Sequence, residues 1–168
     1  MSRLPISGAY APDWGAISML TRDEAGWRCV RCHHHFDRET GRPLACDAEC
    51  DRRRCRALLI ARRGGTHNYG VHHLDGDKAN NAWWNRLAVC NSCHLYIQAS
   101  VIPERLFMFH HSDWFIPYVC GYYAHAAGLS ITREQALEDP ARFLALGQPW
   151  LHSDAIGGSI SATDGGAP

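Results

Sequence analysis

The sequence lacks an excess of charge of either sign and lacks any long apolar run. Its 168 residues include 17 lysines and arginines and 17 aspartates and glutamates, so the formal net charge is zero. A neutral chain is not a wholly basic, histone-like binder of nucleic acid. No stretch approaches the ~18 apolar residues of a membrane-spanning helix, and residues 1–14 contain no apolar run of signal-peptide length. We therefore expect a soluble, cytoplasmic protein that does not associate with a membrane.

The charges are unevenly distributed along the chain. Residues 1–98 contain 14 lysines and arginines against 10 acidic residues, whereas residues 99–168 contain 3 against 7. Six arginines lie within residues 51–63: Arg52, Arg53, Arg54, Arg56, Arg62 and Arg63. Such a cluster can bind nucleic-acid phosphates, although a solvated helix face or pairing with neighbouring acids also accounts for it. The front part of the chain is therefore the better candidate for facing phosphate groups.

Eight cysteines are many for a chain of this length. In a small secreted protein they would indicate a disulfide scaffold, but no export signal precedes them. Four of them form two Cys-x-x-Cys pairs, Cys29 with Cys32 and Cys90 with Cys93. Two such pairs supply the four thiolates of a closed, tetrahedral zinc site, which stabilises small folds whose hydrophobic core is thin. We predict a structural zinc at these four cysteines.

Three further cysteines, Cys46, Cys50 and Cys55, lie between the two pairs. They are compatible with a second zinc site if a histidine completes it, and with free thiols otherwise. The candidates for the fourth ligand are His33, His34, His35 and His67. The eighth cysteine, Cys120, lies in an aromatic-rich segment and is predicted to be a core residue.

Each Cys-x-x-Cys pair is followed directly by a histidine, which also matches the attachment signature of c-type haem. Haem attachment of this type implies export, for which the sequence has no signal. It also leaves His72, His73 and the nearby asparagines unexplained. We therefore favour zinc over haem.

Periodicity and turn residues predict short strands mixed with helices. Strands are expected at residues 27–32, 69–74 and 87–90, and helices at 12–26, 51–63, 92–100, 112–127 and 132–146. Thr132 is a candidate N-cap for the last helix, which Pro140 can split. Residues 151–168 have little to bury and are predicted to be a disordered tail.

Aromatic residues are concentrated in two places along the chain. They are Trp83, Trp84, Trp114, Phe115, Tyr118, Tyr122 and Tyr123. Such side chains can stack on nucleic-acid bases, but in a small zinc-stabilised domain they are more often core residues. We expect these aromatic side chains to lie in the hydrophobic core.

A histidine-rich stretch carries the strongest functional signal. Residues 71–81 read Val-His-His-Leu-Asp-Gly-Asp-Lys-Ala-Asn-Asn, and Asn85 and Cys90-Asn-Ser-Cys-His94 follow. The stretch resembles the HNH endonuclease family, whose members carry a His-His or Asp-His pair on a strand, an Asn in the connecting loop and a last His that opens a helix. Asn85 lies five residues before Cys90 and nine before His94, as the family spacing requires.

The resemblance implies an α+β fold in which a ββα-metal core sits on the four-cysteine zinc knuckle, with flanking helices. It also implies that His72 and His94 bind a divalent ion, that His73 is the general base, and that Asn85 braces the loop and orients the base. Strand alternation agrees with separate roles for the two adjacent histidines, because successive side chains point to opposite faces. A neutral imidazole can accept a proton from water at cellular pH.

The sequence departs from part of the family pattern. Colicin-type relatives have a further histidine one helical turn after the last one, where this chain has Gln98. Two protein ligands completed by water and phosphate oxygens favour Mg²⁺ or Mn²⁺ over tightly bound catalytic Zn²⁺. Asn80 and Asn81 are alternative or additional candidates for the bracing role of Asn85.

The expected organisation is a single HNH nuclease domain over residues 1–150. It comprises a core at 27–98, a basic, cysteine-containing insertion at 37–68 and a helical C-terminal extension at 101–150. The expected function is that of a divalent-metal-dependent endonuclease or nickase that hydrolyses DNA phosphodiester bonds. The alternative is a non-catalytic, zinc-stabilised module that binds nucleic acid. The extension resembles that of some phage and prophage HNH proteins, so phage or mobile-element proteins are candidate partners, and both a monomer and a homodimer remain open.

Overall fold

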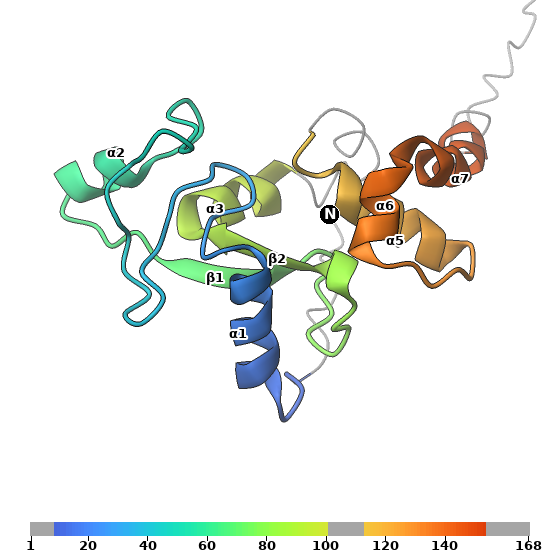
Figure 1. Cartoon of the computed structure of the whole chain (residues 1–168), viewed down its shortest axis with the longest axis horizontal. Coiled ribbons are helices and arrows are strands. Elements are labelled where there is room, and N and C mark those ends of the chain that lie inside the picture. Colours follow the sequence, from blue (N-terminus) through green and yellow to red (C-terminus); the bar gives the residue numbers. More distant parts are fainter. Residues whose placement is uncertain (1–8, 101–112, 154–168) are drawn as a thin grey trace, which may run out of the picture.

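The computed structural model describes residues 9–100 and 113–153, and it combines helices with one small antiparallel sheet. In chain order the elements are α1 (Trp14–Glu24), α2 (Ala57–Arg62), β1 (Tyr69–His73), the 3-10 helix η1 (Trp83–Asn85), β2 (Arg86–Cys90), α3 (Asn91–Ser100), α5 (Ile116–Ala126), α6 (Arg133–Glu138) and α7 (Pro140–Ser153). The predicted α+β class is confirmed. Figure 1 shows the β1–β2 hairpin at the centre, between the cysteine-rich loops and the last three helices.

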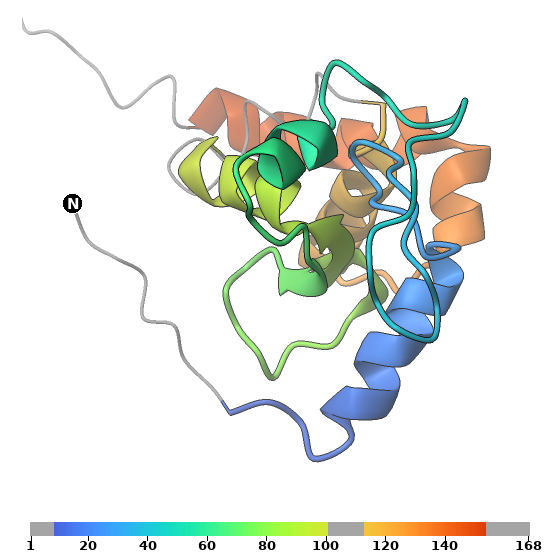
Figure 2. The same cartoon turned by 90° about the vertical axis from the view of Figure 1, so that its left-hand side faces the viewer.

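The two faces of the hairpin are covered by different helices, because side chains alternate along each strand. His73 and its cross-strand partner Arg86 face α1. The His73 ring centroid lies 4.8 Å from that of Trp14, and the Arg86 guanidinium donates hydrogen bonds to α1. On the other face, the ring centroid of His72 lies 4.5 Å from that of His94 in α3. The hairpin therefore lies between α1 and α3 (Figure 2).

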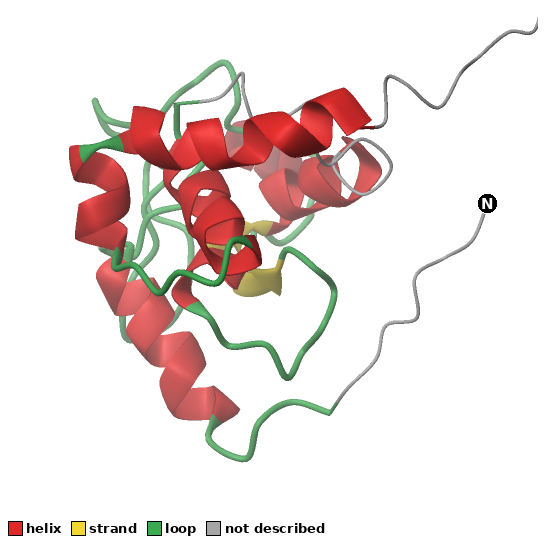
Figure 3. Cartoon of the chain, turned by 90° about the vertical axis from the view of Figure 1, so that its right-hand side faces the viewer, coloured by secondary structure: helices red, strands yellow, loops and turns green. Residues whose placement is uncertain are grey.

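The last three described helices, α5, α6 and α7, pack on one another, and α5 also packs on η1 (Figure 3). Phe115, Tyr118 and Tyr123 extend the core that contains Leu87 and the buried cysteines. Cys120 is fully buried in a smaller cluster within the three helices. The predicted core role of Cys120 is confirmed, and so is that of the aromatic residues Trp84, Phe115, Tyr118 and Tyr123. Trp83 and Trp114 are half-buried at the edge of the core, and the prediction is wrong for Tyr122, which is exposed. None of the helices in the described ranges is both long and apolar enough to span a membrane.

The ends of the helices follow local sequence signals. After α1, Gly26 adopts a left-handed φ of 58°, and the N–H groups of Gly26 and Trp27 donate to the carbonyls of Asp23 and Arg22, both at 2.9 Å. This pattern is a Schellman motif, which uses glycine because an L side chain is strained at positive φ. The helix predicted over residues 12–26 therefore ends as its glycine indicates.

A capping box begins α6. The Thr132 hydroxyl accepts a hydrogen bond from the Gln135 N–H at 3.2 Å, and the Gln135 side chain accepts one from the Thr132 N–H at 2.8 Å. Pro140 is the first residue of α7, where its missing N–H costs no helical hydrogen bond. The single helix predicted over residues 132–146 is therefore two helices, divided at Pro140.

Several predicted elements differ from the structure. Residues 27–32 form no strand beyond one isolated bridge between Arg28 and His35, because Trp27 and His33 adopt left-handed φ angles of 55° and 56°. The helix predicted over residues 51–63 is limited to α2, since residues 52–54 form a turn that brings Cys50 near Cys55.

The C-terminal predictions are only partly covered by the described residues. Helix α7 continues to Ser153, and residues 154–168 of the predicted tail lie outside the described ranges. Residues 101–112 of the predicted extension also lie outside them.

We expect Gly121→Ala to destabilise the fold, because a Cβ at this position of α5 would lie 2.4 Å from the Cβ of Trp84. Overpacking of this kind costs about 1–3 kcal/mol or more when the neighbour cannot move. The matched control is Gly15→Ala in α1, where a Cβ meets nothing within 4 Å. This control should gain up to about 1 kcal/mol from helix propensity. Urea unfolding measures both changes, and equal stability of the two variants would contradict the close packing at Gly121.

Candidate metal centres and histidine site

Two distant parts of the chain bring four cysteines together beside the hairpin. This four-cysteine cluster consists of Cys29, Cys32, Cys90 and Cys93. Their Sγ atoms all lie within 4.8 Å of one another, the side chains are buried, and none of the four forms a disulfide. Four buried sulfur ligands in this arrangement can hold a structural zinc ion, as the sequence predicts.

Backbone geometry fixes the position of the cluster. The turn that contains Cys29 and Cys32 is closed by a 2.7 Å hydrogen bond from the His33 N–H to the Cys29 carbonyl. The Val30 N–H donates to the Ala88 carbonyl at 3.0 Å, which attaches this turn to β2. Cys90 ends β2 and Cys93 follows in the first turn of α3. The cluster therefore fastens the N-terminal turn to the junction of β2 and α3.

The crowding of four thiols alters their acidity. Hydrogen bonding to Cys29, together with burial, raises the pKa of Cys32 and Cys90 above the usual thiol range, whereas hydrogen bonding from its neighbours lowers the pKa of Cys29. Several buried thiolates repel one another unless a cation lies between them. A zinc ion supplies that charge and deprotonates its ligands. The Arg31 guanidinium, which donates to the Cys93 Sγ at 3.6 Å, offers further compensation.

A second group of ligands forms in the segment between the pairs. This mixed cluster, of one histidine and three cysteines, consists of His34, Cys46, Cys50 and Cys55, whose ligand atoms all lie within 4.8 Å of one another. The Nδ1 atom of His34 lies 3.5, 3.8 and 3.6 Å from the three sulfur atoms, in that order. Of the four candidate histidines, the structure thus brings His34 to the cysteines. The mixed cluster can hold a second structural zinc ion.

The environment of His34 suits metal binding. Its side chain is fully buried, and burial lowers the pKa of the imidazole, so the ring is neutral near pH 7. A neutral ring carries one proton, and the tautomer with that proton on Nε2 leaves the Nδ1 lone pair free to bind a metal ion. His67 packs edge-on against the His34 ring at 5.0 Å between centroids and lies outside the ligand group.

An ion-pair network connects the two clusters. The Arg28 guanidinium lies 2.7 Å from the Asp47 carboxylate and 3.1 Å from that of Glu49. A hydrogen bond from Arg28 lowers the pKa of Asp47 to about 2. The same carboxylate accepts a hydrogen bond from the Cys50 N–H at 3.1 Å. Because Arg28 directly precedes Cys29, this network holds the Cys46–Cys50 turn beside the four-cysteine cluster.

His72 and His94 come together on the α3 face of the hairpin. They border an open hollow of about 210 Å³ whose rim includes Asn68 and Asn91. Burial lowers the pKa of His94, which favours the neutral, metal-binding form near pH 7. In the described part of the chain, only the two cysteine-containing clusters bring three or more metal-ligating side chains together. We call His72 and His94 the two-histidine pair.

His73 lies on the opposite face, as strand alternation predicts. Its side chain is only 5% exposed. Its ring centroid lies 4.8 Å from that of Trp14 and 6.1 Å from that of Tyr10, and these two aromatic rings stack on each other. The His73 Nε2 atom lies 3.3 Å from Oδ1 of Asn81. The segment that precedes and opens α1 thus covers the predicted base.

Asn85 is fully buried and braces the loop between the strands. Its Oδ1 accepts a hydrogen bond from the Asp75 N–H at 2.9 Å, and its Nδ2 donates to the Asp75 carboxylate and the Asn80 carbonyl, both at 2.8 Å. These bonds go to the loop, whereas the contact with the His73 ring comes from Asn81. The structure therefore places the loop contacts at Asn85 and the contact with the His73 ring at Asn81.

All six clustered arginines are exposed: Arg52, Arg53, Arg54, Arg56, Arg62 and Arg63. The first three lie between Cys50 and Cys55 and so are carried by the loop that the mixed cluster closes. Arg54 pairs with Asp51 at 3.4 Å. Exposed guanidiniums on a closed loop can contact phosphate groups.

Comparison of the chain with protein-family models, with curated proteins and with solved structures finds no match. The cover that Tyr10 and Trp14 form over His73 is not predicted by the sequence, because nothing in the local pattern relates these aromatic residues to a strand about sixty residues away. The local pattern identifies Trp14 only as an apolar residue of the first helix.

We expect the full-length protein, purified under reducing conditions, to contain about two zinc ions per chain. Cys50→Ser should lower the content to about one, because it removes a ligand from the mixed cluster alone. Cys29→Ser should lower it similarly and also reduce the thermal stability strongly, since the four-cysteine cluster lies in the core. Elemental analysis after dialysis measures the content.

The matched control is Cys120→Ala, which removes a buried cysteine outside both clusters. This variant should keep the full zinc content. Wild-type protein that contains no zinc, or a Cys50→Ser variant with unchanged zinc content, would contradict the assignment.

Proposed function

We propose that this protein is a divalent-metal-dependent endonuclease or nickase that hydrolyses DNA phosphodiester bonds. The observation that carries the proposal is the meeting of His72 and His94, with ring centroids 4.5 Å apart, at an open hollow. The order β1, β2, α3 and the buried brace of Asn85 support the assignment of a ββα-metal core. In this proposal the two cysteine-containing clusters each bind a structural zinc.

His72 and His94 would hold the catalytic ion. A pair of imidazoles leaves several coordination positions for water and phosphate oxygens, which suits Mg²⁺ or Mn²⁺. A bound divalent ion would polarise the scissile phosphate and stabilise the leaving oxygen. The hollow between the two histidines is open to solvent, so a phosphate of an extended substrate can reach it.

His73 would take the proton from the attacking water. Its contact with Asn81 fixes the ring orientation, and imidazole is the side chain that most often acts as a general base. Because His73 is nearly buried under Trp14 and Tyr10, catalysis requires these two aromatic side chains to move aside when DNA binds. His73 is the last residue of β1, and its ring lies on the face opposite His72. The base would therefore have to reach a phosphate at the two-histidine pair around this end of the strand.

The exposed arginines would hold the DNA backbone. Within the described residues, Arg54 is the only one of these six arginines that forms an ion pair, with Asp51. Contacts of this kind add affinity without base specificity.

A second function remains a candidate, namely a non-catalytic, zinc-stabilised module that binds nucleic acid. The burial of His73 favours it, because a structural histidine packed on Trp14 and Tyr10 needs no access to water. In this alternative the arginines bind nucleic acid and the histidines only support the fold.

Plasmid cleavage in the presence of Mg²⁺ or Mn²⁺ separates the two functions. His73→Ala should lower the cleavage rate by about 10²-fold or more while DNA affinity stays nearly unchanged, because only the base is lost. His72→Ala and His94→Ala should instead raise the metal concentration needed for activity. The control is His125→Ala, an exposed histidine of α5, which should cleave like the wild type. A wild-type protein that cleaves neither plasmid nor single-stranded DNA with either ion favours the binding module.

The salt dependence of DNA affinity tests whether the exposed arginines contact the DNA backbone. Replacing Arg52, Arg53 and Arg54 by glutamine should flatten the slope of log affinity against log salt by up to about three units, at about 0.9 per phosphate contact. Affinity should fall for all sequences alike. Arg142→Gln on α7 is the control and should leave the slope unchanged. An unchanged slope in the triple variant would move the DNA path away from this loop.

A further inference from the structure

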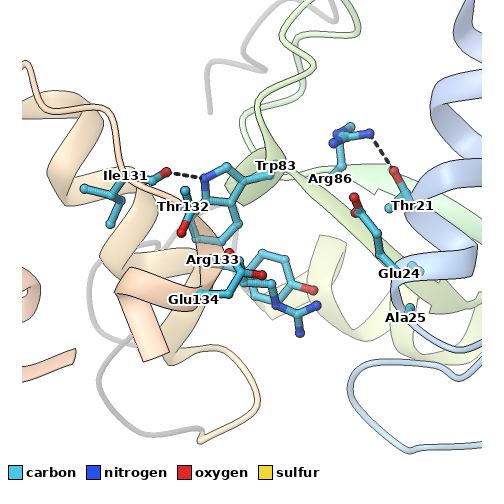
Figure 4. Close-up of a pocket in the computed structure, with 11 residues that line it drawn as sticks. Thr21, Glu24, Ala25, Trp83, Arg86, Ile131, Thr132, Arg133 and Glu134 are labelled. Carbon is cyan, nitrogen blue, oxygen red and sulfur yellow. Dashed lines mark hydrogen bonds between the residues drawn. The ribbon is translucent and has the colours of Figure 1, made fainter. Parts of the chain in front are cut away.

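A second cavity, of about 410 Å³, lies on the α1 side of the hairpin, between α1 and the helices α5 and α6. Figure 4 shows Thr21 and Glu24 of α1 on one side and Thr132, Arg133 and Glu134 on the other. Because Arg86 shares its face with His73, this cavity lies across the hairpin from His72 and His94. We call it the arginine pocket, after Arg86 and Arg133, which both line it.

Arg86 is a buried cation without a nearby counterion. Arg86 is 9% exposed, and its guanidinium donates hydrogen bonds to the Thr21 hydroxyl at 2.7 Å and to the Ile17 carbonyl at 3.4 Å. Its Nε atom is buried and has no hydrogen-bond partner. In the described ranges, no carboxylate lies within 4.0 Å of this guanidinium. A buried charge with only neutral partners is costly, so the site favours an anion.

Arg133 brings a second guanidinium to the pocket. Its Cζ atom lies 5.9 Å from the centre of the Tyr118 ring, and its Nε is also buried without a partner. The ring of Trp83 forms another wall and is fixed by a 2.8 Å hydrogen bond from its Nε1 to the Ile131 carbonyl. The pocket thus combines two guanidiniums with two aromatic walls.

The two glutamates of the pocket do not neutralise these arginines. Glu24 and Glu134 are both exposed, and within the described ranges neither pairs with Arg86 or Arg133 within 4.0 Å. Water screens exposed carboxylates more than it screens the buried guanidinium of Arg86. The pocket therefore has two buried hydrogen-bond donors without a partner, the Nε–H groups of Arg86 and Arg133, and in the described ranges neither guanidinium has a carboxylate within 4.0 Å.

We propose that the arginine pocket binds the phosphate group of a small phosphomonoester. Two guanidiniums match the two charges and several oxygens of a phosphate better than the single charge of a carboxylate. The volume beyond the phosphate and the rings of Trp83 and Tyr118 suit an organic body attached to it. The proposal does not depend on the nuclease function, because the pocket and the two-histidine pair lie on opposite faces of the hairpin.

The test uses the full-length, zinc-loaded protein without added divalent ions. Inorganic phosphate is titrated at constant ionic strength, and the arginine Nε–Hε signals are followed by nuclear magnetic resonance. We expect saturable shifts of the Arg86 and Arg133 signals. Arg133→Gln should weaken phosphate binding by about tenfold or more, because it removes a charge-assisted hydrogen bond. Arg142→Gln, the matched control, should bind phosphate like the wild type.

Two further ligands, phenyl phosphate and acetate, test which class of ligand the pocket binds. Phenyl phosphate should bind more tightly than inorganic phosphate and shift the Trp83 indole signal, whereas acetate should bind more weakly. Because Arg86→Gln can destabilise the fold, Arg86→Lys serves as the second variant, and it should weaken binding while the chain stays folded. Shifts that do not saturate, binding unchanged by Arg133→Gln, or tighter binding of acetate would overturn the proposal. His72→Ala should leave phosphate binding unchanged, so a failure of the nuclease proposal does not affect this test.

Discussion

The rest of the structure depends on the contact between two Cys-x-x-Cys turns that lie far apart in the sequence. A two-stranded hairpin alone is only marginally stable in water. Here the turn of Cys29 and Cys32 packs on the end of β2 and the start of α3, where Cys90 and Cys93 lie. The contact buries the hairpin on one side and fixes the direction in which α3 leaves it. His94 directly follows Cys93, so the same contact also sets the position of the His94 ring opposite His72.

The hairpin separates chemical environments because its two faces are covered by different helices. The α3 face carries the two-histidine pair and an open hollow. The α1 face carries His73 beneath two aromatic rings and, next to it, the buried guanidinium of Arg86. A single strand pair thus positions two imidazoles beside an open hollow on one side, and a third imidazole and a buried cation on the other. The Asn85 side chain forms hydrogen bonds with the loop between the strands, and these bonds support the strand register that places His72 and His73 on opposite faces.

Features that depend on short-range patterns could be predicted from the sequence, and those that depend on the path of the chain could not. The cysteine pairs, the capping residue Thr132, the division at Pro140 and the opposite orientation of His72 and His73 all follow from local spacing or alternation. The choice of His34 among four histidines depends on how residues 37–55 fold back, and no pattern in the sequence specifies that path. The left-handed φ of Trp27 also replaced a predicted strand, since a bulky residue at positive φ is not expected from its type. The cover over His73 and the pairing of Arg86 with α1 arise only from long-range packing.

The two cysteine-containing clusters differ in how much chain each must close. The ligands of the mixed cluster span 21 residues, from His34 to Cys55, whereas Cys32 and Cys90 of the four-cysteine cluster are 58 residues apart. Loop-closure entropy rises with the logarithm of this separation, and short loops close faster. The ligands of the mixed cluster are also synthesised before the second cysteine pair. The segment from His34 to Cys55 can therefore close first, as a preformed unit, whereas the hairpin and the two-histidine pair are complete only when His94 has been made.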